Sequence, residues 1–166
     1  MTSISVLAAD ILSFQVVSLF SALTVVSFLM RRPVARVLRG SARRTFWGLV
    51  SLAAIASVTL LGRHFEGFAP VFWLFDGTLW SQVAITQQAN FVLNMILFLP
   101  AGIAVTFATR RPVASLLFLV ALSFAIESIQ QSTGLGAPDP ADWVANSLGA
   151  LVGVIIALPG SRRAKN

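Results

Sequence analysis

The sequence predicts an all-α fold: a polytopic membrane helical bundle with about five transmembrane helices, in a single membrane domain spanning residues 1–166. Of the 166 residues, 57% are hydrophobic and only 11% are charged, and the mean hydropathy is +0.85. A soluble globular domain carries roughly 25% charged residues, so this balance is typical of an integral membrane protein. The chain has no cysteine, which excludes disulfides, thiolate metal sites and a cysteine nucleophile.

Five apolar segments are long enough to cross a hydrocarbon core of about 30 Å, which takes roughly 17–25 helical residues. Their approximate bounds are Ile11–Met30, Thr45–Gly62, Asn90–Thr109, Pro112–Gln131 and Ala141–Leu158. The N-terminal segment lacks the basic region of a secretory signal, and the apolar run after it is too long for one. We therefore expect the first segment to be a retained transmembrane helix.

The basic residues predict the orientation of the bundle. Eleven of the twelve Lys and Arg residues follow the first, third or fifth span, and only Arg63 lies on the opposite side. Because cytoplasmic loops concentrate Lys and Arg, this asymmetry predicts an N-terminus outside and a C-terminus in the cytoplasm. All six acidic residues then fall at the outer side. The same rule accounts for the net charge of +6, so we expect no nucleic-acid partner.

Two connecting segments have distinctive compositions. After the first span, arginines recur at helical spacing from Arg32 to Arg43, which fits either a short interfacial helix on anionic lipids or a solvated basic loop. Between the second and third spans, the aromatic-rich stretch from Phe65 to Trp80 fits either an interfacial aromatic belt or a lid over a lipid-facing pocket.

Polar side chains gather at the outer ends of the last three predicted helices, in stripes at helical spacing. The stripes are Gln87, Asn90 and Asn94 on the third span, Ser123, Glu127 and Gln130 on the fourth, and Asp139, Asp142 and Asn146 on the fifth. With a rise of about 1.5 Å per residue, Asn94, Glu127 and Asn146 are expected at matching depth. The candidate ligand-binding residues are Asn94, Glu127, Gln130, Asp139, Asp142 and Asn146.

The fifth helix offers a structural alternative for its acids. Asp139 followed by Pro140 fits an N-cap and a proline at the first helical position, and Asp142 then lies in the first turn. Further along, Gly149 and Gly153 have a spacing that lets helices approach closely, which would aim the polar stripe at the same neighbouring helix. The two asparagines of the stripes also fit simple hydrogen bonds between helices.

Glu127 is the residue least explained by local structure. It lies about one turn inside an apolar helix, so it must take up a proton or find a cation or hydrogen-bond donors. Arg63 and His64 are the basic residues nearest along the outer side. Glu127 and Asp142 are the two candidates for a catalytic role and for a metal site. We expect no cofactor apart from a divalent cation that these two carboxylates would suit.

Three motifs occur in an order that resembles the VanZ-like family of short bacterial membrane proteins. They are Asn94-MIL-Phe98-L-Pro100-A-Gly102, Glu127-SI-Gln130 and Asp139-PA-Asp142-WVA-Asn146-SLGALVG. The resemblance covers a core of about residues 90–156. It implies a multi-pass protein of the cell (plasma) membrane, linked to glycopeptide resistance of the teicoplanin type. The residues that it carries over are Asn94, Pro100, Gly102, Glu127, Gln130, Asp139, Asp142, Asn146 and Gly149.

These observations favour a protein that binds or handles a lipid-linked cell-wall intermediate through a polar site at the outer leaflet. Its partners would be membrane lipids and that intermediate. Carboxylates and carboxamides suit a sugar, a peptide or a divalent cation better than a bare phosphate. One alternative is a membrane-embedded hydrolase or transferase with Glu127 as general base and Asp142 as acid or metal ligand. Another is a non-catalytic structural or assembly subunit, and a proton-coupled transporter is a weaker fourth.

Overall fold

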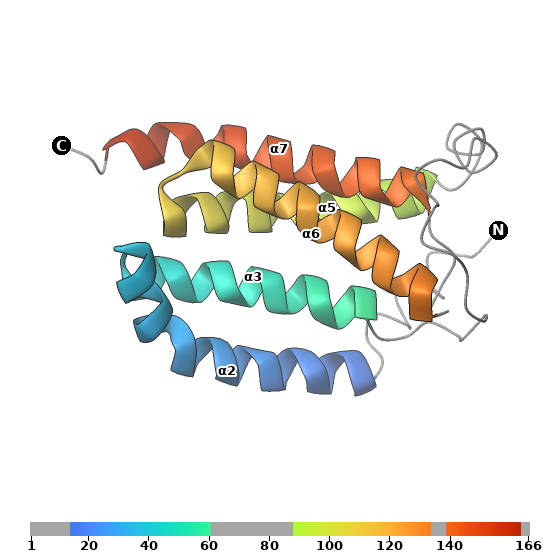
Figure 1. The fold of residues 1–166 in the computed structure, drawn as a ribbon, viewed down its shortest axis with the longest axis horizontal. Helices are drawn as coiled ribbons and strands as arrows, with labels where there is room; N and C mark the ends of the chain where they lie inside the picture. The colour runs from blue at the N-terminus through green and yellow to red at the C-terminus, as the bar shows by residue number, and fades with distance from the viewer. Residues whose placement is uncertain (1–13, 61–87, 134–138, 164–166) are drawn as a thin grey trace.

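The structure, a computed structural model, describes residues 14–60, 88–133 and 139–163. All regular secondary structure in these ranges is helical (Figure 1). The helices are α2 (Phe14–Leu38), α3 (Ala42–Leu60), α5 (Gln88–Thr109), α6 (Pro112–Thr133) and α7 (Pro140–Arg163). This confirms the predicted all-α membrane bundle.

Four helical stretches are long and apolar enough to cross a membrane, judged by length and composition. They are Phe14–Leu38, Asn90–Thr109, Pro112–Gln130 and Pro140–Ser161. The second predicted span, Thr45–Gly62, corresponds to α3, which forms a helix of 19 residues but is not among the four. Its first turn contains Arg43 and Arg44, and these two charges lower its mean hydropathy.

The helices alternate in direction, so that each runs antiparallel to the one before it in this order (Figure 1). α5 and α7 therefore run in the same direction, and they share the most extensive contact in the bundle. α6 packs against α7, α3 against α5, and α2 against α3. We call the end with the α2–α3 and α5–α6 connections (residues 39–41 and 110–111) the arginine end. The opposite end, where α6 finishes and α7 begins, is the acid end.

Three glycines bring α5 and α7 into backbone contact. A Cβ atom on Gly149 would overlap the carbonyl group of Met95, and one on Gly153 would overlap the carbonyl oxygen of Leu99. Gly102 lies opposite Gly153 in the same seam. The close approach predicted from the Gly149-x-x-x-Gly153 spacing is therefore confirmed, with α5 as the neighbour.

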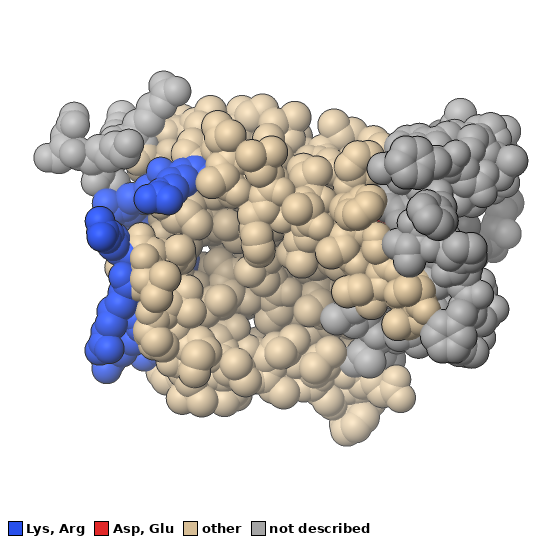
Figure 2. Space-filling view, in the orientation of Figure 1, with Lys and Arg blue, Asp and Glu red and all other residues tan. Residues whose placement is uncertain are grey.

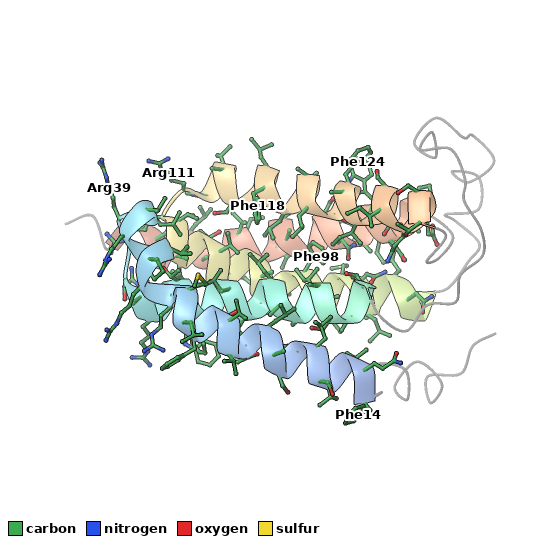
Figure 3. All side chains as sticks on the ribbon, turned by 60° about the horizontal axis from the view of Figure 1, so that its bottom comes forward. Phe14, Arg39, Phe98, Arg111, Phe118 and Phe124 are labelled. Atoms are coloured by element: carbon green, nitrogen blue, oxygen red, sulfur yellow. The ribbon has the colours of Figure 1, made fainter. Side chains whose placement is uncertain are left out.

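The apolar core lies between α3, α5, α6 and α7. Phe98 of α5 and Leu119 of α6 are fully buried, and Ile55 of α3 packs in the same cluster (Phe98 is labelled in Figure 3). Many large apolar side chains remain exposed, among them Ile96 and Ile155. An apolar exterior of this kind would be costly in water but suits contact with lipid chains.

α2 differs from the predicted first span. The expected span ended at Met30, but the helix continues through Pro33 to Leu38, so residues 31–38 form neither a loop nor a separate interfacial helix. Proline removes one backbone hydrogen bond and favours a bend, and Figure 1 shows the last turns of α2 turning away from its main axis. The Arg31 guanidinium lies over the Phe28 ring, 3.3 Å from its centroid, in a cation–π contact.

Charge separates along the bundle. The arginines of the described ranges gather at one end, as Figure 2 shows in blue. The acids of the described ranges, Glu127, Asp139 and Asp142, belong to the end of α6 and the start of α7. α2 begins at the acid end and α7 finishes at the arginine end. Which end faces the cytoplasm stays a prediction from the positive-inside rule.

Candidate functional site

Glu127 lies near the end of α6, and its side chain is only 2% exposed. Its Oε2 atom accepts a hydrogen bond of 3.2 Å from the backbone N–H of Asp139, immediately before α7. The carboxylate therefore faces the N-terminus of α7, where the helix dipole is positive. This position explains how a carboxylate is accommodated inside an apolar bundle.

Asp139 caps α7, as the sequence predicted. Its Oδ1 atom accepts a hydrogen bond of 2.8 Å from the N–H of Ala141, and the helix begins at Pro140. The carbonyl oxygen of Asp139 accepts bonds from the N–H groups of Asp142 and Trp143, at 3.0 and 3.3 Å. Capping is thus the demonstrated role of the Asp139 side chain.

The first turn of α7 is tied to α6. Asp142 lies in this turn and is 8% exposed. The next residue, Trp143, donates its indole N–H to the carbonyl oxygen of Val120 at 3.3 Å, and its ring meets the Phe124 ring edge-on at 6.5 Å between centroids. These contacts hold the Asp142 carboxylate close to the α6–α7 junction.

Asn146 lies deeper in the bundle than Glu127. Its Nδ2 atom donates to the Oγ atom of Ser123 on α6 at 2.9 Å, and both side chains are buried. Ser123 and Glu127 are one helical turn apart, which is about 6 Å along α6. The predicted matching depth is therefore wrong for this pair, because Asn146 bonds at the level of Ser123, whereas Glu127 bonds to Asp139, the residue before α7. The expectation that Asn146 faces the same helix as Gly149 is also wrong, since its bond goes to α6.

Asn94 is half-buried on α5 and lies next to Met95, whose carbonyl contacts Gly149. This contact places Asn94 near the level of the α7 turn that holds Asn146 and Gly149. Within the described ranges, no hydrogen bond joins the Asn94 side chain to another candidate residue. Asn94 therefore belongs to the same end of the bundle, but no hydrogen bond among the described residues links it to Glu127, Gln130 or Asn146.

Gln130 connects α6 to α3. It is 1% exposed, and its Nε2 atom donates to the backbone carbonyl oxygen of Thr59 at 2.6 Å. None of the sequence motifs that indicate the site includes a residue of α3. A backbone carbonyl has no sequence signature, so this partner could not have been found from residue types.

Two of the candidate side chains have a buried acceptor atom without a donor among the described residues. Oε1 of Gln130 and Oδ1 of Asn146 are both buried, and neither has a hydrogen-bond partner in the described part of the chain. The carboxylates of Glu127 and Asp142 add further acceptor oxygens at the same end. Such a group suits a ligand that supplies donors, namely ammonium groups, hydroxyls or a cation.

Three further features were expected at the acid end: a bound cation, basic residues near Glu127, and an aromatic stretch. No three His, Cys, Asp or Glu side chains within the described residues are grouped so that they could hold a metal ion. A cation between Glu127 and Asp142 stays a prediction. The basic residues Arg63 and His64 and the aromatic stretch from Phe65 to Trp80 lie outside the described residues.

The sequence was compared with the profiles of known protein families. The profile of the VanZ/LLP1 family matches residues 15–159. The chain belongs to the VanZ/LLP1 family. The match extends the predicted VanZ-like core of residues 90–156 to include α2 and α3, and it confirms the resemblance. A search of curated proteins and a search of solved structures each give no significant match.

The VanZ/LLP1 match contains every candidate residue. Asn94, Glu127 and Gln130 lie in its central part, and the three candidates of α7 lie before its end at residue 159. The polar group at the acid end is therefore part of the family region rather than an addition to it.

Proposed function

We propose that this VanZ/LLP1 protein binds a lipid-linked cell-envelope intermediate at the outer leaflet of the bacterial plasma membrane, and thereby contributes to resistance against teicoplanin-type glycopeptides. The observation that carries the proposal is that two buried acceptors, Gln130 Oε1 and Asn146 Oδ1, have no donor among the described residues and lie at the same end as Glu127 and Asp142.

The energetics of buried polar groups support a ligand here. A buried acceptor that lacks a donor costs about 1–3 kcal/mol. A ligand that presents hydroxyl or ammonium groups would recover part of this cost, and the nearby carboxylates would favour a positive charge. Sugar and peptide portions of an envelope intermediate carry such donors, and the lipid portion would remain in the bilayer.

In the predicted orientation, this site lies at the outer leaflet of the membrane. If the arginine end faces the cytoplasm, the acid end faces the outer leaflet, where cell-wall material is assembled and where a glycopeptide acts. The arginines of the described ranges lie at one end of the bundle and the acids at the other, which supports this arrangement.

The test is teicoplanin susceptibility in cells that express Glu127→Gln or Asp142→Asn. Both changes keep the side-chain shape and remove the charge. We expect each variant to reach wild-type levels in the membrane but to lose most of the protection. Ser51→Ala is the matched control, because within the described part of the chain its hydroxyl bonds to the Trp47 carbonyl of its own helix. Full protection in both charge-removing variants would overturn the proposal.

A structural role is the second candidate, and specific contacts favour it. Glu127 bonds to the backbone of Asp139, Gln130 to that of Thr59, and Asn146 to Ser123. These bonds join α3, α6 and the start of α7. Under this alternative, Asn146→Ala would lower the melting temperature, and protection would fall only in proportion to the amount of folded protein. Loss of protection in a fully folded variant would exclude it.

A further inference from the structure

A cavity of about 630 Å³ opens at the arginine end, between α2, α3, α5 and α6. Its size lies within the range of about 300–1,000 Å³ that is usual for ligand pockets. The walls are mainly apolar and include Val37, Leu49, Leu52, Val105, Ala114 and Phe118. This cavity is separate from the acid end, because its lining comes from the opposite halves of the helices.

Two arginines line the same cavity. Arg39 and Arg111 are exposed, and Figure 3 shows both at this end of the bundle. Neither guanidinium has a hydrogen bond or an ion pair with another described residue. The acids of the described ranges all lie at the other end, so none of them neutralises this pair.

The backbone holds the two arginines in position. Arg39 follows α2 in a left-handed conformation with φ 52°, and the N–H of Gly40 closes the helix end on the carbonyl of Ala35 at 2.9 Å. The N–H of Arg111 donates to the Thr109 hydroxyl at 3.2 Å, in the connection between α5 and α6. Both arginines therefore emerge from short, hydrogen-bonded turns rather than from long loops.

We propose that this cavity binds an anionic phospholipid, with an acyl chain between the helices and the phosphate at Arg39 and Arg111. An apolar cavity beside two guanidinium groups that have no ion pair with any described residue matches a molecule that is apolar along its chain and negative at its head. Arginine binds phosphate oxygens with two parallel hydrogen bonds, which favours it over a zwitterionic headgroup that carries its own cation. In the predicted orientation this lipid belongs to the cytoplasmic leaflet, which is rich in anionic lipids.

The test is native mass spectrometry of the full-length protein in detergent, titrated with phosphatidylglycerol or with phosphatidylcholine of the same acyl chains. We expect the wild type to bind phosphatidylglycerol at least about fivefold more tightly. Arg39→Gly and Arg111→Gln should each weaken that binding roughly five- to tenfold and leave phosphatidylcholine unaffected. Glycine is chosen at position 39 because it tolerates the positive φ of Arg39.

Arg32→Gln is the matched control, because Arg32 is an exposed arginine of the same end that does not line the cavity. It should retain wild-type affinity. Equal binding of the two lipids by the wild type would overturn the proposal, as would equal losses in Arg32→Gln and the two rim variants.

A second variant tests the acyl-chain position. Ala114→Phe places a ring in the cavity and should reduce phosphatidylglycerol binding while the arginines remain. A wild-type dimer that is lost in Ala114→Phe and is insensitive to added lipid would show a second copy in the cavity, and would also overturn the proposal. Neither outcome depends on the function proposed for the acid end.

Discussion

The Glu127 carboxylate accepts a hydrogen bond from the backbone N–H of Asp139 at 3.2 Å, joining two residues twelve positions apart across the α6–α7 connection. A buried carboxylate here has two consequences. It holds the start of α7 against α6, and it places negative charge where a ligand with donor groups would bind. The amide of a Glu127→Gln variant can still accept the backbone hydrogen bond but carries no charge. This variant therefore separates the structural role from the role of the negative charge.

The first prediction concerns the stability of Glu127 variants. Glu127→Gln keeps an acceptor oxygen for the Asp139 N–H, so its melting temperature in detergent should stay close to wild type. Glu127→Ala leaves that partly buried N–H without this partner and should lose about 1 kcal/mol of stability. Equal stability of the alanine variant and the wild type would show that the bond contributes nothing to folding.

The second prediction concerns the α5–α7 seam. Gly153→Ala would place a Cβ against the carbonyl oxygen of Leu99, which is backbone and cannot move aside, so stability should fall by about 1–3 kcal/mol. Gly48→Ala is the matched control, because its nearest neighbour, the Cβ of Ala108, would lie at an ordinary 3.4 Å. Thermal unfolding that gives the same loss for both variants would contradict the seam geometry.

The third prediction concerns the bond between Ser123 and Asn146. A double-mutant cycle with Ser123→Ala and Asn146→Ala should give a coupling free energy near 0.6 kcal/mol and no more than roughly 1.7 kcal/mol, the range measured for bonds between membrane helices. Unfolding in a mild detergent provides the four stabilities. Strict additivity of the two single losses would mean that the side chains do not interact.

The fourth prediction concerns orientation. The natural chain has no cysteine, so single cysteines report position without background. Arg32→Cys at the arginine end should react with a membrane-impermeant maleimide only after cells are permeabilised, whereas Ser132→Cys near the end of α6 should react in intact cells. The reverse pattern would place the acid end in the cytoplasm and would exclude the proposed outer-leaflet site.

Hydropathy predicted the helices well where composition changes sharply. The start of α6 at Pro112 and the end of α5 at Thr109 were both predicted correctly, because the charged Arg110 and Arg111 separate the two apolar segments. The end of α2 was missed by eight residues. Hydropathy marks where a chain is apolar, but arginine, valine and leucine continue a helix beyond that point.

The candidate site was predicted in residue types but not in geometry. The cap formed by Asp139 followed from local rules, since Asp before Pro has a specific helical meaning. The relative depth of Glu127 and Asn146 depends on how α6 and α7 pack against each other, which is a tertiary property. The partner of Gln130 is the Thr59 carbonyl, and no pattern in the sequence identifies a backbone acceptor on another helix.

The central claim is that the acid end binds a donor-rich, lipid-linked molecule. It is tested most directly by mass spectrometry of the molecules that copurify with the protein from native membranes. The wild type should retain a lipid-linked species bearing sugar or amino groups, and the folded double variant Glu127→Gln, Asp142→Asn should lose it. Retention of the same species by both proteins, or of ordinary phospholipid alone by the wild type, would contradict the claim.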